Sequence, residues 1–137
     1  MYGMLFSLSN RIQAVGDSQF VDITMKQHFL MIVLGMLGEY RPTLNETAQL
    51  VGCSYQNVKR MAAQLEKNGY LAIRTDGADR RKQRLVGTGK FERMGEETRA
   101  AGEAFMERLY RGITREELRQ AIQTLKRMDR NMGGAYD

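Results

Sequence analysis

The stretch that most constrains the fold is TLNETAQLVGCSYQNVKRMAAQLEKNG, residues 43–69, because it holds the start signals of two helices with only a tight turn between them. Thr43 and Glu46 form a capping box, in which each side chain satisfies a backbone N–H group at the first turn of a helix. Gly52 permits the turn, and Ser54 is a good N-cap for the second helix. The stretch therefore predicts a short helix, a tight turn and a longer amphipathic helix packed against the first.

The second helix, at about 54–68, has one apolar face and one polar face. Val58, Met61 and Leu65 recur at helical spacing and are expected to be buried. The polar face has residue types that suit duplex DNA: amides for adenine, a guanidinium for guanine, and hydroxyl or ammonium groups for phosphates and sugars. The candidate contacts are Ser54, Tyr55, Gln56, Asn57, Lys59 and Arg60. A solvated face on an ordinary amphipathic helix has a similar composition, so this helix alone does not establish DNA binding.

A charged hairpin is predicted after this helix. Residues 70–75 (YLAIRT) alternate in polarity as a half-buried strand does, and residues 83–87 (QRLVG) are a candidate partner strand. The connection at about 75–84 (TDGADRRKQR) is expected to turn at Gly77. The cations of this region are Arg74, Arg80, Arg81, Lys82 and Arg84. A charged loop is usually solvated, and Arg80, Lys82 and Arg84 are expected either to contact phosphates or to be solvated.

The positive charge of the chain is concentrated in its middle third. The net charge of +5 favours an anionic partner, either nucleic acid or an acidic membrane surface. Residues 59–93 hold ten Lys or Arg residues and four Asp or Glu residues. Because this local surplus exceeds that of the whole chain, we expect the binding function to lie in this segment.

The two ends of the chain are predicted to be helical. Apolar residues recur at helical spacing over about 1–16, where Gly16 is expected to end the helix. They recur again over about 89–132, where one helix is expected to run to Gly112 before a final helix begins. These apolar stripes are wider than a small core needs, which favours dimerisation through both ends; a thick monomeric core is the alternative. With 137 residues and one Pro, the chain is expected to be a single, mainly α domain with a small β-hairpin.

Residues 43–91 resemble the winged helix–turn–helix of the MarR-type (multiple-antibiotic-resistance) transcriptional regulators. The matching motifs are Ala48–Leu50 in the first helix, Leu65–Tyr70 at the end of the second, Asp79–Arg81 as the D-x-R pattern of the wing, and the closing Thr88. The resemblance implies a winged helix–turn–helix core at about 24–88, flanked by N- and C-terminal dimerisation helices. Gly87 and Phe91 depart from the family pattern, which has Leu and Gly there, but they lie outside the DNA-contact positions.

The resemblance also implies a function. The family consists of homodimeric, ligand-responsive regulators, usually repressors, that bind a pseudo-palindromic double-stranded DNA operator. The recognition helix at about 54–68 would enter the major groove, and the wing at about 75–84 the minor groove. Arg81 would be inserted into the minor groove, and Asp79 would orient it by a charge-assisted hydrogen bond. A small aromatic or phenolic effector would bind between the dimerisation helices and the DNA-binding lobe.

The remaining residues offer no catalytic constellation. The single His28 lies in an apolar stretch, where packing is favoured over a metal site, and the single Cys53 is expected to pack in the turn rather than to sense oxidants. We therefore expect no enzyme activity, no metal and no cofactor. With no signal-peptide pattern and no apolar run long enough to span a bilayer, a cytoplasmic protein without a membrane partner is expected. A winged-helix adaptor that binds an acidic protein surface, with no DNA function, is the alternative.

Overall fold

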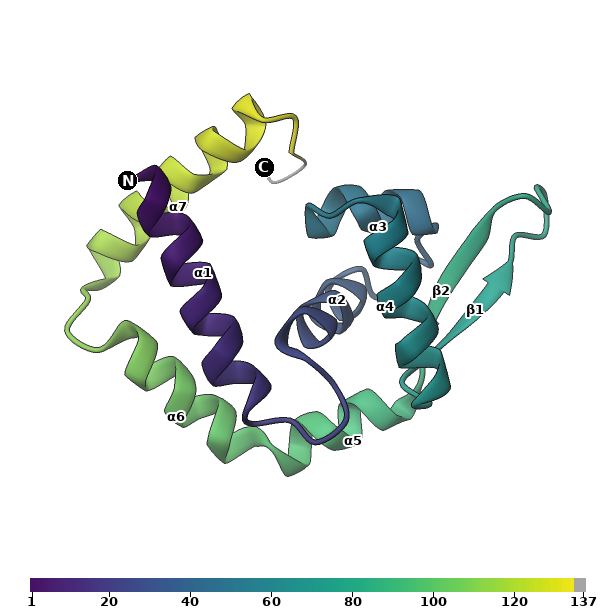
Figure 1. The fold of residues 1–137 in the computed structure, drawn as a ribbon, viewed down its shortest axis with the longest axis horizontal. Helices are drawn as coiled ribbons and strands as arrows, with labels where there is room; N and C mark the ends of the chain where they lie inside the picture. The colour runs from purple at the N-terminus through teal and green to yellow at the C-terminus, as the bar shows by residue number, and fades with distance from the viewer. Residues whose placement is uncertain (135–137) are drawn as a thin grey trace. The chain divides into compact units, whose positions relative to one another are not determined.

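The computed structural model describes residues 1–134, which form seven α-helices and one antiparallel β-hairpin (Figure 1). The elements are α1 (Tyr2–Asp17), α2 (Met25–Met36), α3 (Leu44–Val51), α4 (Tyr55–Lys67), β1 (Leu71–Thr75), β2 (Gln83–Gly87), α5 (Gly89–Glu97), α6 (Arg99–Tyr110) and α7 (Arg115–Asn131). They belong to two compact units, Met1–Glu92 and a second unit that begins at Arg93. The predicted mainly α fold with a small hairpin is confirmed.

The helix–turn–helix forms where its start and stop signals predict. At the start of α3, Glu46 N–H donates to Thr43 Oγ1 over 3.2 Å, and Thr43 N–H donates to Glu46 Oε2 over 2.7 Å. Gly52 ends α3 with a left-handed φ of 71°, which costs a residue with a side chain more than it costs glycine. Ser54 Oγ accepts from Asn57 N–H over 3.3 Å at the start of α4. These local bonds fix where both helices begin, and therefore which face α4 presents.

An apolar core lies beneath the helix–turn–helix. Side chains from α2, α4 and both strands form most of it, and its largest fully buried apolar members are Leu30, Met31, Val58, Leu65, Leu71 and Leu85. Thr47 of α3 is also fully buried, and its hydroxyl donates to Thr43 O over 2.8 Å, so burial leaves no unsatisfied donor. Because the apolar face of α4 is held in this core, the opposite, polar face is directed outward.

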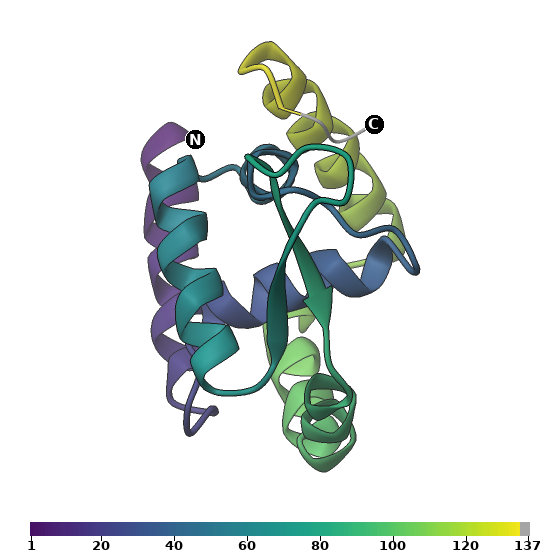
Figure 2. The same ribbon diagram turned by 90° about the vertical axis from the view of Figure 1, so that its right-hand side faces the viewer.

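The hairpin is flanked by a third extended segment. β1 and β2 pair antiparallel with Ile73 opposite Leu85, and the twist of the two strands is visible in Figure 2. Leu85 N–H donates to Pro42 O over 2.9 Å, and Thr43 forms an isolated bridge to Arg84. The segment before α3 therefore attaches the hairpin to the helix–turn–helix, a pairing that the sequence did not predict.

The first helix does not end at its glycine. α1 continues through Gly16 to Asp17, so the prediction that Gly16 ends the helix is wrong. Gly16 is buried against Met25 of α2, where a Cβ atom would lie 2.6 Å from Met25 Sδ. Asp17 Oδ1 also accepts from Met25 N–H over 2.5 Å. The glycine thus permits the close approach of α1 to the start of α2.

Two helices, α5 and α6, lie where one was predicted. The break falls at Thr98, whose hydroxyl donates to Met94 O over 2.8 Å. A threonine hydroxyl bonded to the carbonyl four residues earlier competes with regular helix geometry and often bends a helix. The predicted continuous helix up to Gly112 is therefore wrong. None of the residues that the structure places in α5, α6 and α7 is buried.

Candidate nucleic-acid interface

The outward face of α4 and its N-cap hold the six residues predicted to contact base edges and phosphates. Ser54, Tyr55, Gln56, Asn57, Lys59 and Arg60 are all exposed. On the opposite face Val58 and Met61 are buried. Arg60 Nη2 donates to Asn57 Oδ1 over 3.2 Å, which keeps the guanidinium beside the amide one turn earlier. This face can offer a guanidinium and amides to base edges, with hydroxyl and ammonium groups beside them.

The wing loop is shaped by Asp76. Its Oδ1 accepts from the backbone N–H groups of Ala78 and Asp79, over 2.9 and 2.8 Å, in a turn that aspartate commonly forms. Lys82 N–H then donates to Asp79 O over 2.9 Å. Gly77 does not adopt a positive φ, and a Cβ atom there would meet nothing within 4 Å. The prediction that Gly77 eases the turn is therefore wrong, because Asp76 supplies the turn.

Asp79 lies where it can orient Arg81 at the wing tip. Arg81 donates twice to Asp79 Oδ1, from its backbone N–H over 3.0 Å and from Nε over 3.4 Å. The Arg81 side chain is nevertheless 93% exposed, so its guanidinium remains accessible to an anion. An ion pair this exposed contributes little to folding stability, which favours a role in binding.

A hollow of about 300 Å³ lies between the wing and the helix–turn–helix. The first turn of α3 forms one wall, and the others are lined by Tyr55, Arg81, Lys82, Gln83 and Arg84. Three predicted DNA contacts from two separate elements therefore face the same hollow. Arg74 on β1 and Arg80 at the wing tip are exposed but lie outside it, as do the other predicted residues of α4 and its N-cap.

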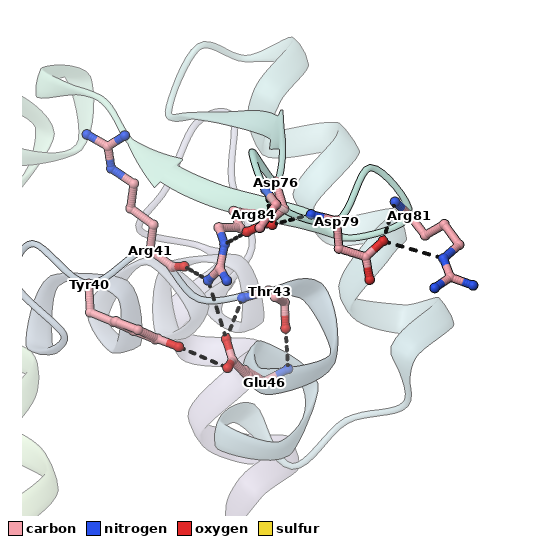
Figure 3. Close-up of polar contacts among 9 residues, drawn as sticks. Tyr40, Arg41, Thr43, Glu46, Asp76, Asp79, Arg81 and Arg84 are labelled. Carbon is pink, nitrogen blue, oxygen red and sulfur yellow. Dashed lines mark hydrogen bonds and ion pairs between the residues drawn. The ribbon is translucent and has the colours of Figure 1, made fainter.

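A polar cluster that the sequence did not predict lies at the base of the wing (Figure 3). Arg84 forms an ion pair with Asp76 through Nε and donates from Nη1 to Arg41 O over 2.7 Å. Its Nη1 also lies 4.0 Å from Glu46 Oε2. Tyr40 donates its hydroxyl hydrogen to Glu46 Oε1 over 2.9 Å. These five residues, which we call the wing-base cluster, join the wing to the start of α3.

Both carboxylates of the wing-base cluster are held ionised. The Arg84 guanidinium and the backbone N–H groups of the turn lower the pKa of Asp76 to about 2. The backbone N–H of Thr43 lowers the pKa of Glu46. The Arg84 side chain is paired with Asp76 and 31% exposed, so it is less available to a phosphate than the exposed cations of the wing tip. The sequence signal that could have indicated this ion pair was the presence of Asp76 near one end of the predicted connection and of Arg84 at the other.

An apolar cavity of about 440 Å³ lies among α1, α2 and the turn before α4. Aliphatic and aromatic side chains form most of its walls: Leu5, Leu8, Ile12, Met25, Phe29 and Val51. Lys26 is a cation in this wall, and Cys53 also lines the cavity from the turn. Cys53 is half-buried. The cavity lies beside the predicted N-terminal dimerisation helix, where the resemblance implies an effector.

His28 packs in an aromatic cluster. Its ring stacks on Phe20 with 4.7 Å between centroids and faces Phe91 at 5.7 Å. Burial lowers the pKa of His28, which favours the neutral imidazole. Phe91, a departure from the family pattern, therefore helps to attach the start of α5 to α2. Within residues 1–134, no group of three His, Cys, Asp or Glu side chains is placed to hold a metal ion, and no helix has the length and hydropathy needed to cross a membrane.

No family model and no curated protein matches the chain, whereas solved structures match over most of its length. BpsR from Bordetella bronchiseptica is 21% identical, with a TM-score of 0.77 over 93% of this chain and 91% of its own. A MarR protein from Peptoclostridium difficile is 18% identical, with a TM-score of 0.82 over 96% and 86%. MepR from S. aureus, in a complex with DNA, is 21% identical, with a TM-score of 0.78 over 93% and 96%.

The likeness covers at least 93% of this chain in each of these three structures. It therefore extends beyond the helix–turn–helix and hairpin to the helices on both sides of them. The capped α3–turn–α4 motif and the paired β1–β2 hairpin are the parts that the sequence resemblance had indicated. The chain has the winged helix–turn–helix fold of the MarR-type transcriptional regulators.

Proposed function

We propose that this protein is a DNA-binding transcriptional regulator and not an enzyme. The observation that carries the proposal is that Tyr55 of α4 and Arg81 and Lys82 of the wing face one hollow, so that two exposed polar elements can bind one duplex. The middle of the chain also holds most of the excess positive charge, which a polyanion requires. Among proteins of the same fold, MepR has been solved in a complex with DNA, and the DNA binding of BpsR is regulated by a small molecule.

Each element has a defined task in this proposal. α4 enters the major groove, where Gln56, Asn57 and Arg60 contact base edges. The wing enters the minor groove, where Arg81 gains from the negative potential of a narrow, A·T-rich segment. The remaining predicted residues bind or approach phosphates and sugars: Ser54, Tyr55, Lys59, Arg74, Arg80 and Lys82. Asp79 orients Arg81 and does not contact DNA.

The active species is a homodimer in this proposal. α6 and α7 have no buried residue, although each has apolar side chains that a monomer would leave in water. The exposed apolar residues of the two ends include Tyr2, Phe6, Leu8, Met106, Tyr110, Ile122 and Leu125. Two copies paired through these ends present two recognition helices, which fit successive major grooves about 34 Å apart on a pseudo-palindrome.

The response to a small molecule is assigned to the apolar cavity beside α1. Its aliphatic walls suit an aromatic ring, and the ammonium of Lys26 suits a carboxylate or phenolate. BpsR shows that an aromatic acid, 6-hydroxynicotinic acid, regulates a protein of this fold. A ligand that shifts the spacing of the two recognition helices lowers the affinity for DNA, so that the protein acts as a repressor released by its effector.

The proposal is tested by selecting duplexes from a random-sequence library with the wild-type protein. We expect a pseudo-palindromic duplex to be enriched, with an affinity that falls steeply as salt increases, because bound phosphates release counterions. Arg81→Ala should weaken binding to that duplex while the oligomeric state in analytical ultracentrifugation is unchanged. If no duplex is enriched and the residual binding to DNA does not change with salt, the protein is not a DNA-binding regulator. A winged-helix adaptor that binds an acidic protein surface is then the better explanation.

A further inference from the structure

We propose that Arg84 is a positioning residue that aims the wing tip at DNA through Asp76 and does not itself contact DNA. This inference rests on the proposed function, and it assigns a role to a cation that the sequence suggested either as a phosphate contact or as a solvated side chain. Arg84 lines the hollow between the wing and α3, but its guanidinium is directed toward Asp76, Glu46 and the Arg41 carbonyl (Figure 3).

The geometry links Arg84 to the minor-groove arginine by a series of contacts. Arg84 Nε bonds to Asp76 Oδ2, and this ion pair closes the loop at its base. The other oxygen of Asp76 accepts from the backbone N–H of Asp79, over 2.8 Å. Asp79 Oδ1 in turn accepts from the Nε of Arg81, over 3.4 Å. The direction of Arg81 therefore depends on where Arg84 holds Asp76.

The same guanidinium attaches the loop to the helix–turn–helix. Arg84 Nη1 donates to the carbonyl of Arg41 over 2.7 Å and lies 4.0 Å from Glu46 Oε2. Glu46 belongs to the capping box at the start of α3, since it accepts from Thr43 N–H over 2.7 Å. Because the loop base is joined to α3, and α3 packs on α4, the wing tip is held at a fixed position relative to the recognition helix.

The local charge also argues against a direct phosphate contact. The Arg84 guanidinium has a carboxylate on each side, Asp76 and Glu46, and both are ionised. A phosphate would have to displace one of these two carboxylates or approach a site whose positive charge is already neutralised. By contrast, Arg81 has an exposed guanidinium with a single carboxylate contact on one nitrogen. The two arginines of the wing are thus suited to different tasks.

Two variants separate the ion pair from the turn that Asp76 also forms. Asp76→Asn keeps an oxygen that accepts from Ala78 and Asp79 but loses the charge that holds Arg84. Arg84→Gln removes the guanidinium and leaves Asp76 in place. Each should weaken binding to the selected duplex about tenfold, toward the lower end of the range for losing an arginine–base contact. The double variant should be no weaker than the weaker single variant, because either change breaks the same bond.

The sign of the Asp76→Asn effect is diagnostic. Removing a negative charge from a DNA-facing loop strengthens binding if net charge alone decides, because repulsion between the carboxylate and the phosphates is lost. A positioning role for the ion pair predicts weaker binding in spite of this gain. Fluorescence anisotropy with the labelled, selected duplex measures the Kd of each variant. Lys67→Gln, at the far end of α4, is the charge-matched control for Arg84→Gln and should leave the Kd unchanged.

A third comparison removes what Arg84 is proposed to position. The background protein has Arg80, Arg81 and Lys82 all changed to Ala. In it, Arg84→Gln should alter the Kd by less than about twofold, because the side chains that Arg84 is proposed to position are absent and the two sets of changes are not additive. A direct phosphate contact would instead lower affinity in both backgrounds. Hydrogen exchange without DNA should show faster exchange of the backbone amides at 78–82 in Arg84→Gln, with α4 unchanged.

The outcomes distinguish this inference from the proposed function. If the wild-type protein selects no duplex, both fail. If it selects a duplex and Asp76→Asn binds it as tightly as the wild type or more tightly, only the positioning role is overturned. An equal loss from Arg84→Gln with and without the wing-tip cations would also overturn it, in favour of a direct contact with DNA.

Discussion

Tyr70 donates its hydroxyl hydrogen to Asp22 Oδ1 over 2.6 Å and joins the end of the recognition-helix segment to the loop between α1 and α2. Lys90 at the start of α5 completes the junction. Its ammonium donates to Asn68 O over 2.6 Å, lies 3.4 Å from Asp22 Oδ2 and sits 4.4 Å from the centroid of the Tyr70 ring. The loop between α1 and α2, the segment that follows α4 and the start of α5 are therefore joined at one junction, although they are distant in sequence.

Tyr70→Phe should lower the free energy of unfolding by about 1 kcal/mol, the usual net value of one hydrogen bond, or up to ~2 kcal/mol because the acceptor is ionised. Tyr70 is only 2% exposed, so the ring stays packed and the loss reports the hydroxyl. Urea unfolding at a fixed protomer concentration measures the change. Tyr55→Phe, at an exposed position on α4 outside the proposed dimer interface, should have no effect. Equal stabilities for Tyr70→Phe and the wild type would show that this bond does not hold the junction together.

The same junction predicts how stability depends on pH. The hydrogen bond from Tyr70 and the charge of Lys90 lower the pKa of Asp22 from its ordinary value of 3.8. A carboxyl group with a lowered pKa in the folded state stabilises the protein above its ordinary pKa, and this contribution is lost as pH falls through the folded value. The stability difference between the wild type and Asp22→Asn should therefore be constant near neutral pH and shrink below about pH 4. A difference that grows on acidification would contradict the assignment.

Asp76 should show the same behaviour over a wider interval, because its pKa is lowered from 3.8 to about 2. The contribution of the ionised Asp76 to the free energy of unfolding should be fully present above about pH 4 and should be lost as the pH falls toward 2. The carboxyl resonance of Asp76, followed by NMR in a pH titration of the free protein, gives the pKa directly. Arg84→Gln should return this pKa part of the way toward 3.8, since the two backbone N–H bonds remain. No change in the Asp76 pKa would show that the ion pair is not formed in solution.

Gly52→Ala should destabilise the helix–turn–helix, whereas Gly35→Ala should not. Gly52 has a φ of 71°, a left-handed conformation that costs a residue with a Cβ atom roughly 1–2 kcal/mol. Gly35 lies inside α2 with open space around its Cα, so alanine there should be neutral or gain about 0.5–1 kcal/mol from helix propensity. Thermal unfolding of the two variants measures both effects. A Gly52→Ala protein as stable as the wild type would show that the turn accommodates a side chain.

Arg60 and Lys59 are neighbours on α4 with different predicted tasks. Arg60→Ala should weaken binding to the selected duplex by about 1–3 kcal/mol and relax the preference for one base pair in each half-site. Lys59→Ala should weaken binding to all duplexes alike and reduce the slope of log Kd against log salt by about 1 in each protomer. Binding measured on a panel of single-substitution duplexes at several salt concentrations separates the two results. Identical profiles for both variants would reject the division between base and phosphate contacts.

The apolar cavity can be closed by substitution. Ile12→Trp should fill part of the 440 Å³ space without touching α4, so that DNA is still bound but 6-hydroxynicotinate, benzoate or 4-hydroxybenzoate no longer releases it. Val21→Trp, at a fully exposed position, should respond to these acids as the wild type does. If one of the acids still releases DNA from the Ile12→Trp protein, the effector binds elsewhere.

The helix–turn–helix could be predicted from the sequence because its signals are local. The Thr43–Glu46 capping box, the Gly52 turn and the Ser54 cap each depend on residues within a few positions of one another, and each is present in the structure. The two strands could be placed for a similar reason, since the alternation of polarity around Leu71 and Leu85 fixes which side chains are buried. Their short separation leaves a hairpin as the simplest connection.

The wing-base cluster could not be predicted in this way. Its central bond joins Arg84 to the carbonyl of Arg41, 43 residues earlier, and depends on a backbone pairing beside β2 that has no periodic pattern. The prediction that Gly16 ends α1 was wrong for another reason. A glycine that ends a helix cannot be distinguished by sequence from one that allows a neighbouring side chain to pack closely. Thr98 likewise has no local signal for whether its hydroxyl bonds to solvent or to Met94 O.

The ion pair between Asp76 and Arg84 has a consequence for how such a wing can change. Because it closes the loop at both ends, the segment between them can be replaced while its anchorage to the helix–turn–helix stays the same. Substitutions that arise in this segment can then alter which minor grooves are preferred without disturbing the recognition helix. Asp76 and Arg84 are therefore suitable end points for replacing the loop. A wing tip taken from a regulator with another operator and joined at these two residues should have the same orientation relative to the recognition helix as the tip it replaces.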